Sequence, residues 1–199
     1  MQSDLNRRRL LSGAAAGALA LASGASALTV DEARALVDQV VGEINAVITS
    51  GKSVDAMIRD FEGIFTRYAD VAYIAQSSLG PAGRAASKAE LSQYSQAFSG
   101  YIARKYGKRF KEFIGGTVEV TGARPLKSFF EVVSVAKLRG QSPFEVRWQV
   151  FEKNGRRKFF NLVIEGVNML ASERTEIGAM LDQAGGSIPT LAEMLQRAG

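Results

Sequence analysis

The sequence predicts a single α+β domain in which helices come first, a mixed or antiparallel sheet of about four strands follows, and two helices close the chain. Between residues 30 and 113, apolar side chains recur every three or four positions, which is typical of amphipathic helices. From residue 117 to residue 164 the pattern changes to alternation and to β-branched and aromatic runs, which favours strands. Because the two kinds of element are segregated along the chain, we expect one layered α+β domain.

The first 27 residues have the pattern of a signal peptide. Three arginines at positions 7–9 precede an apolar run from Leu10 to Leu21, and Ala25-Ser26-Ala27 is a site that a signal peptidase accepts. The apolar run is shorter than the about 20 residues that span a bilayer. The arginines also resemble a twin-arginine export motif, with an ordinary secretory signal as the alternative. We therefore expect a signal peptide over 1–27 and a mature domain over 28–199.

The composition of the mature domain indicates a protein that is stabilised by packing. The chain contains no Cys, so no disulfide bond contributes to its stability. Without the first 27 residues, 22 Lys and Arg stand against 19 Asp and Glu, a net charge of +3. Basic runs at 104–105, 108–111 and 156–158 are dispersed among acidic residues, so we expect solvated faces and no nucleic-acid groove. A docking patch for anionic head groups or for an acidic partner is the alternative.

Capping signals delimit the first two helices. Thr29-x-x-Glu32 is a capping box, which predicts a helix from about residue 30, and Gly51 ends this helix. Ser53 can cap a second helix, whose apolar stripe extends to Tyr68.

The longest helix is expected next in the chain. A short segment through residues 71–74 comes first, and a break is expected at residues 79–83, which contain Gly and Pro. Ser87-x-x-Glu90 is a second capping box, which opens the longest helix. We expect this helix to end at Gly115-Gly116.

Strand patterns fill the next fifty residues. The predicted strands are Thr117–Thr121, Phe129–Leu138, Phe144–Val150 and Lys158–Ile164. Asn154-Gly155 between the last two is a strong hairpin signal. The last strand is apolar on both faces, so we expect it to be covered on both sides. The closing helices are predicted at Ser172–Ala184 and Thr190–Arg197, with a third capping box at Thr190-x-x-Glu193.

The residue inventory argues against an enzyme. The chain has no His and no Cys, which removes the commonest general base, the commonest metal ligand and the thiol nucleophile. Glu165, Glu173 and Glu176 are close in sequence, and paired carboxylates can hydrolyse glycosides. We expect Glu173 and Glu176 to be solvated instead, because acidic residues are favoured in the first turn of a helix. The prediction is a non-enzyme without catalytic residue, metal or cofactor, and a carboxylate hydrolase is the last-ranked alternative.

Bulky apolar side chains are the most distinctive feature of the composition. The chain has eleven Phe, five Tyr and one Trp. Tyr94, Tyr101 and Tyr106 fall on the longest helix, and tyrosines suit a cavity wall because they combine an apolar ring with a polar tip. Composition alone is compatible with a filled core and with a hollow one.

Motifs along the chain carry a family resemblance. Val146-x-Trp148-x-Val150 precedes the Asn154-Gly155 turn, and residues 159–169 read Phe-Phe-Asn-Leu-Val-Ile-Glu-Gly-Val-Asn-Met, followed by Arg174. Further motifs upstream are Phe61 to Tyr68, Leu79-Gly80 and the series Phe98, Tyr101, Tyr106 and Phe110. Together they resemble the MlaC (toluene-tolerance) family over nearly the whole mature chain.

The chain departs from this family pattern at several positions. Gly80-Pro81-Ala82-Gly83 stands where members usually have Gly-Arg-Tyr-Trp. Asn161 and Asn168 replace the usual Asp and Ser, and the usual Trp after Asn-Gly is absent. These departures indicate a divergent member, in which cargo and partners are less determined than the fold.

The resemblance implies a monomeric periplasmic carrier that holds the acyl chains of a phospholipid in an apolar pocket between sheet and helices. Such a carrier shuttles lipid between an outer-membrane lipoprotein complex and an inner-membrane ABC transporter with a substrate-binding subunit, and maintains outer-membrane lipid asymmetry. The residues expected to line the pocket are Phe61, Phe65, Tyr68, Tyr94, Phe98, Tyr101, Val132, Trp148, Val150, Phe160, Leu162, Val167 and Met169. Arg174 and Tyr106 are expected at the pocket mouth or near the head group.

Two other functions stay open from the sequence. The first is a carrier of a different apolar lipid, such as a hopanoid. The second is a non-lipid periplasmic interaction module with a solid core, which docks a partner through the basic longest helix.

Overall fold

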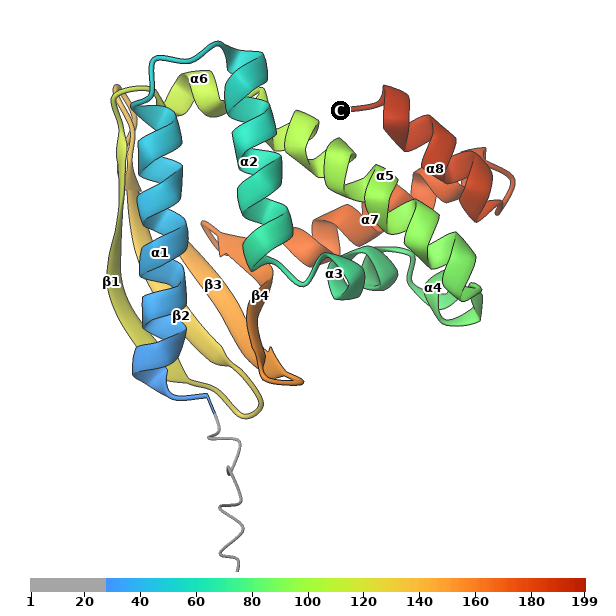
Figure 1. Ribbon diagram of the computed structural model, residues 1–199, viewed down its shortest axis with the longest axis horizontal. Coiled ribbons are helices and arrows are strands. Elements are labelled where there is room, and N and C mark those ends of the chain that lie inside the picture. The colour runs from blue at the N-terminus through green and yellow to red at the C-terminus, as the bar shows by residue number, and fades with distance from the viewer. Residues whose placement is uncertain (1–27) are drawn as a thin grey trace, which may run out of the picture.

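The computed structural model describes residues 28–199, and the signal peptide predicted over residues 1–27 lies outside them. In this part of the chain the elements before the sheet are α1 (Val30–Ile48), α2 (Val54–Tyr68), α3 (Val71–Ser78), α4 (Pro81–Ala85), α5 (Lys88–Gly107) and α6 (Phe110–Phe113). The strands are β1 (Thr117–Pro125), β2 (Phe130–Lys137), β3 (Phe144–Lys153), β4 (Arg156–Ile164) and β5 (Val167–Asn168). The chain closes with α7 (Met169–Gln183) and α8 (Ile188–Arg197), so the predicted α+β order is confirmed (Figure 1).

Two of the three predicted capping boxes are present. The Thr29 side chain accepts a hydrogen bond from Glu32 N–H, while the Glu32 carboxylate accepts one from Thr29 N–H, and Ser87 and Glu90 repeat this arrangement. The third prediction is wrong. α8 begins at Ile188 and is capped by Ser187, because Pro189 has a fixed φ that suits the first turn of a helix.

The break expected at residues 79–83 contains a short helix, and the predicted end of the longest helix is wrong. Pro81 begins the short helix α4 inside the expected break, after Gly80 has turned the chain with a φ of 60°. α5 ends at Gly107 and not at Gly115-Gly116, because the Arg109 N–H bonds to the Tyr106 carbonyl and tightens the last turn. Gly107 also lets α2 approach closely, since a Cβ there would lie 2.6 Å from Ile58 Cγ1.

The five strands form one antiparallel sheet in the order β1-β2-β3-β4-β5. The hairpin predicted at Asn154-Gly155 is confirmed, and both residues have the positive φ, 54° and 69°, that a tight two-residue turn requires. β5 is a two-residue edge strand that the sequence pattern did not predict.

The β3–β4 ladder contains a bulge. Gln149 pairs with Asn161, but the next residue, Val150, pairs with Phe159, so Phe160 is the extra residue. Because side chains alternate between the faces of a strand, this insertion turns Phe159 to the face that carries Val150 and turns Phe160 to the opposite face.

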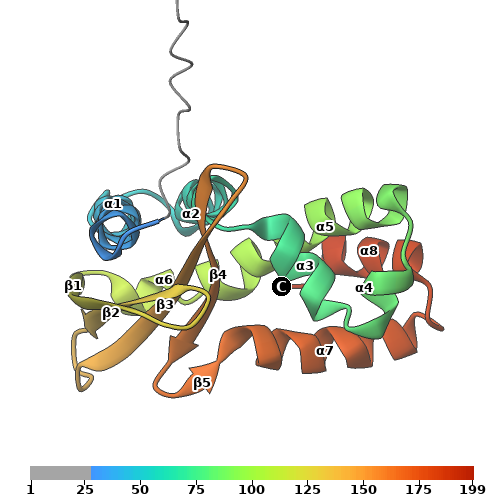
Figure 2. The same cartoon turned by 90° about the horizontal axis from the view of Figure 1, so that it is seen from below.

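The helices cover the sheet unequally. Figure 2 shows α1 and α2 over one face, which we call the inner face, and a group formed by α3, α5, α7 and α8 beyond the β4 side. The inner face carries Val132, Trp148 and Val150. β4 is covered on both sides as predicted, because Phe159 on the inner face and Val163 on the outer face are both buried.

α1 is fixed to the free edge of the sheet by a side chain. Asn45 donates a hydrogen bond from Nδ2 to the Val118 carbonyl (2.9 Å) and accepts one at Oδ1 from the Val118 N–H (3.0 Å). This pair satisfies backbone groups of an edge strand that would otherwise face solvent. Among the described residues, none of the helices combines the length and the apolar character that crossing a membrane requires.

Candidate functional site: the apolar interior

Adjacent strands form the sheet wall of the interior. Val132 pairs with Trp148, and Val132 and Val150 are both 0% exposed, with Trp148 at 5%. Trp148 Nε1 donates a hydrogen bond to Ser134 Oγ at 2.9 Å, which satisfies the indole N–H away from water. Leu162 pairs with Trp148 from the other side and is half-buried. The wall is therefore apolar, and its polar groups are internally bonded.

α2 contributes the facing aromatic side chains. Phe65 packs against Phe159 with 6.3 Å between ring centroids, and Phe159 packs edge-on against Trp148 at 5.4 Å. Tyr68 is buried, and its hydroxyl donates to Glu43 Oε1 on α1. This hydrogen bond to a carboxylate, together with burial, raises the pKa of Tyr68. The Tyr68 ring thus lies in the interior while its polar tip is held by α1.

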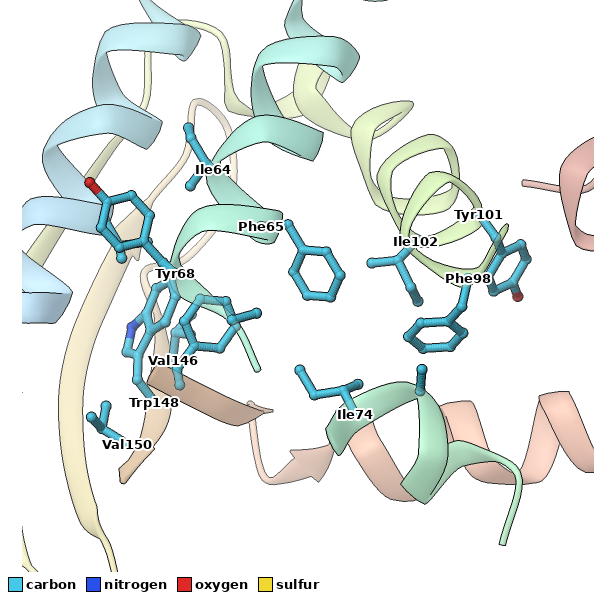
Figure 3. Close-up of a cluster of buried hydrophobic side chains, with 14 of the residues drawn as sticks. Ile64, Phe65, Tyr68, Ile74, Phe98, Tyr101, Ile102, Val146, Trp148 and Val150 are labelled. Carbon is cyan, nitrogen blue, oxygen red and sulfur yellow. The ribbon is translucent and has the colours of Figure 1, made fainter. Parts of the chain in front are cut away.

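α5 supplies the wall opposite the sheet. Tyr94, Phe98 and Tyr101 form a continuous buried series, with ring centroids 5.7 Å apart for the first pair and 6.4 Å apart for the second. The Tyr94 hydroxyl lies 2.8 Å from Ser78 Oγ on α3, and burial raises the pKa of Tyr94. Figure 3 shows Phe98 and Tyr101 on α5, Ile74 on α3 and Phe65 on α2 around one region.

A polar cluster closes the α5–α7 end of this region. Lys105 Nζ donates to Glu173 Oε1 at 2.8 Å and to Glu176 Oε2 at 2.6 Å. Tyr101 donates its hydroxyl to Glu176, and Tyr106 donates its hydroxyl to Glu173. Burial raises the pKa of Tyr101 to about 12, and the bond to Glu176 acts in the same direction. The cluster therefore ties α5 to α7 through two tyrosines and one lysine.

Glu173 contradicts the prediction that it is a solvated residue. It is 4% exposed, and its Oε2 atom has no hydrogen-bond partner among the described residues. The helix α7 begins at Met169 instead of Ser172, so Glu173 lies in the second turn and faces α5. Glu176 is exposed as expected, but it is held by Lys105.

Several predicted residues lie apart from the interior. Phe160 lies on the outer face of the sheet, where it packs against Phe151 at 4.9 Å and against Phe129 and Tyr73. Val167 is 54% exposed on β5.

The remaining predicted residues lie at the margins. Phe61, Tyr106 and Met169 are half-buried, and Arg174 is exposed on α7. Arg174 lies over the α3–α4 turn, because its Nε atom is 3.1 Å from where a Cβ on Gly80 would be.

The interior also contains buried residues that the predicted set lacks. Phe159, Ile64, Ile74, Ile102 and Val146 are all buried in it. Ile64 and Ile74 belong to apolar patterns visible in the sequence, and Val146 alternates with Trp148. Phe159 carries no such signal, because only the bulge turns it inward.

Two open hollows lie outside this interior. One, of about 310 Å³, is on the outer face of the sheet beside Arg124, Arg147 and Glu145. The other, of about 600 Å³, lies between the β3–β4 hairpin and the junction of α2 and α3. The residues predicted to line an apolar pocket pack instead on one another, with tyrosine hydroxyls bonded at the margins.

Comparisons with known proteins agree with the fold. The structure is similar to that of a phospholipid-binding protein from Ralstonia solanacearum, solved in complex with a phospholipid, with a TM-score of 0.70. The two chains are 17% identical, and the match covers 83% of this chain and 95% of the other. A family model described as MlaC protein matches residues 34–197, which extend from α1 to the last residue of α8. Because that match spans most of the sequence, the chain belongs to the MlaC family.

Proposed function

We propose that this protein is a phospholipid-binding carrier of the periplasm and not an enzyme. The observation that carries the proposal is the apolar interior, in which the wall of Val132, Trp148 and Val150 faces aromatic side chains of α2 and α5. Membership of the MlaC family and the phospholipid bound in the Ralstonia solanacearum structure support it.

The energetics of lipid transfer require such an interior. Each methylene group removed from water contributes about 0.8 kcal/mol, so about 30 methylenes of a diacyl lipid represent roughly 25 kcal/mol. A free phospholipid therefore hardly crosses an aqueous gap, and a carrier must shelter the chains. The side chains proposed to contact them are Phe65, Tyr68, Phe98, Tyr101, Val132, Trp148, Val150 and Leu162.

The cellular role extends this proposal. With the predicted signal peptide removed, the domain over residues 28–199 acts in the periplasm as a monomer. It receives and delivers lipid between an outer-membrane lipoprotein complex and an inner-membrane ABC transporter with a substrate-binding subunit. This traffic maintains the lipid asymmetry of the outer membrane.

One observation favours a second candidate, an interaction module with a solid core. The interior side chains pack on one another, with ring centroids 5.4 to 6.4 Å apart. A lipid carrier must move these side chains apart when it loads, whereas an interaction module never does. Uptake of lipid from vesicles separates the two functions, and the identity of the extracted lipid separates a phospholipid carrier from a hopanoid carrier.

The test compares a phenylalanine of the interior with a phenylalanine on the outer face of the sheet. Phe98 is fully buried in the interior, and Phe160 is half-buried on the outer face. Phe98→Glu puts a charge into the proposed lipid site, and an unpaired charge is unfavourable in an apolar environment. The amount of phospholipid that this variant takes up from vesicles is therefore expected to fall below about a tenth of that of the unsubstituted protein. Phe160→Glu is the matched control and is expected to bind normally.

Circular dichroism establishes that each variant is folded. If Phe98→Glu does not fold, Leu162→Glu replaces it, at a half-buried position of the inner face. Unchanged lipid binding by a folded inner-face variant would contradict the proposed site.

A further inference from the structure

The hollow between the β3–β4 hairpin and the α2–α3 junction has the dimensions of a ligand site. Its volume is about 600 Å³, within the usual range of roughly 300 to 1,000 Å³ for small-molecule pockets. The hairpin forms one side with Lys153, Asn154, Arg156 and Lys158. The opposite side is formed by residues 66 and 69–71 at the end of α2 and the start of α3.

The net charge of the residues that line this hollow is positive. Three cations line it, and the one carboxylate in the lining, Asp70, already accepts a hydrogen bond from Tyr73 N–H at 3.0 Å. Among the described residues, Lys153, Arg156 and Lys158 form no ion pair, whereas the neighbouring Arg157 is paired with Glu32 and Glu152. The hollow thus has a net charge of about +2, which suits a phosphate group.

Lys158 is the most enclosed of the three cations. Its ammonium group donates to the Arg67 carbonyl at the end of α2, which holds the side chain against that helix end. Burial lowers the pKa of Lys158, and the charge of Asp70 acts in the opposite direction. An anion in the hollow would compensate the lost hydration of this ammonium group.

The hollow adjoins the apolar interior. Ala69 forms a β-bridge with Phe159, and the Asp70 N–H donates to the Phe159 carbonyl at 2.9 Å. The Phe159 side chain is buried against Trp148 and Phe65 on the inner side of this connection. One residue of β4 therefore lies between the basic hollow and the apolar interior, so that a site for a phosphate would adjoin a site for acyl chains.

We infer that this hollow binds a phosphate ester, and that in the loaded protein it holds the phosphate of the lipid whose acyl chains occupy the interior. This inference rests on the proposed function. The shared chemistry is a phosphate monoester or diester, supplied either by a lipid head group or by a soluble phosphate.

Calorimetric titration of residues 28–199 with three probes tests the inference. Dihexanoyl phosphatidylglycerol has chains and phosphate, dihexanoylglycerol has chains alone, and glycerol 3-phosphate has phosphate alone. The variant is Lys153→Gln combined with Arg156→Gln, at two exposed positions. The matched control is Arg59→Gln combined with Lys88→Gln, two exposed cations that also form no ion pair in residues 28–199.

The variant with both hairpin substitutions is expected to bind the phospholipid about tenfold more weakly than the unsubstituted protein at low ionic strength. This difference in affinity is expected to shrink with added salt. The affinity of this variant for dihexanoylglycerol is expected to stay within about twofold of that of the unsubstituted protein. The control variant is expected to bind both the phospholipid and dihexanoylglycerol within about twofold of the unsubstituted protein. If the unsubstituted protein binds glycerol 3-phosphate and the hairpin substitutions abolish this binding, the result would also support the phosphate site. The site would then accept soluble phosphates as well as lipid head groups.

Three results would overturn the inference. Equal losses for the phospholipid and dihexanoylglycerol, or equal affinities in hairpin and control variants, would remove the phosphate site while leaving the proposed function intact. If the unsubstituted protein bound neither diacyl compound, the proposed function would fail, and with it the inference that the hollow holds the phosphate of a lipid.

Discussion

Val150 pairs with Phe159 and not with Phe160 across the β3–β4 ladder. The bulge places the Phe159 ring between Trp148 and Phe65 in the interior, and it sends the Phe160 ring to Phe129 and Phe151 on the outer face. Two adjacent residues of the same type therefore have different surroundings.

The first prediction compares alanine substitutions at these two positions. Phe159→Ala is expected to lower the free energy of unfolding by about 3 to 5 kcal/mol, because it leaves a cavity in a buried position. Phe160→Ala is expected to cost about half as much, since that ring is partly exposed. Urea denaturation followed by circular dichroism measures both. Equal losses, or a larger loss at Phe160, would contradict the placement of the bulge.

The bulge also explains which part of the site could be predicted from the sequence. Helical spacing identified Phe65, Tyr68, Phe98 and Tyr101, and strand alternation identified the inward residues of β3. Strict alternation along β4 from Leu162 would put Phe160 on the inner face and Phe159 on the outer face. A single inserted residue reverses the faces beyond it, and no local signal in the sequence marks that insertion.

The second prediction concerns the two carboxylates that share Lys105. Glu173→Gln is expected to lower the free energy of unfolding by about 1 to 3 kcal/mol, because it removes the ion pair with Lys105 and puts a buried amide where the Glu173 Oε2 atom has no hydrogen-bond partner. Glu176→Gln is the control, since its side chain is 48% exposed against 5% for Glu173, and it is expected to cost about 1 kcal/mol or less. Chemical denaturation at neutral pH measures both variants. A larger loss of stability for Glu176→Gln than for Glu173→Gln would show that Lys105 stabilises the fold mainly through Glu176.

This cluster shows where local rules fail. Acidic residues near a helix start are usually solvated, which is why Glu173 was expected at the surface. Its burial depends on Lys105 and Tyr106, which are more than sixty residues away in sequence. Two of the three capping boxes and the hairpin turn were predicted correctly because their partners are three residues apart or adjacent.

The third prediction is the pH dependence of stability that follows from the same cluster. Burial alone would raise the pKa of Glu176, but the hydrogen bonds and charge of Lys105, together with Tyr101, hold it below its ordinary value of 4.5. A carboxyl group with a lowered pKa stabilises the fold above pH 4.5, and this contribution is lost as the pH falls. Burial alone would lower the pKa of Lys105, but its bonds to Glu173 and Glu176 raise it above 10.5, so its contribution is present below that pH and is lost above it.

The measurement for this prediction is denaturation of the unsubstituted protein and Glu176→Gln at about pH 7 and at about pH 3. Glu176→Gln is expected to have a lower free energy of unfolding than the unsubstituted protein at neutral pH, and this difference is expected to shrink in acid. A difference that is independent of pH would mean that the charge of Glu176 contributes nothing.

The fourth prediction concerns two glycines with open space around them. Gly155→Ala is expected to destabilise the protein by about 1 to 2 kcal/mol, because its φ of 69° is strained for an L side chain. Gly178→Ala lies in the helix α7 with no atom near the added methyl group, and it is expected to stabilise the protein by about 0.5 to 1 kcal/mol. Thermal unfolding of both variants checks the opposite signs, and destabilisation by Gly178→Ala would contradict the described environment of α7.

The most direct test of the central claim is native mass spectrometry of residues 28–199, produced with the leader segment in a bacterial periplasm and purified without detergent. The account predicts about one diacyl phospholipid per chain, and lipid extraction would identify it. Protein that carries no lipid, and that also takes up none from phospholipid vesicles, would contradict the carrier function and favour the interaction module.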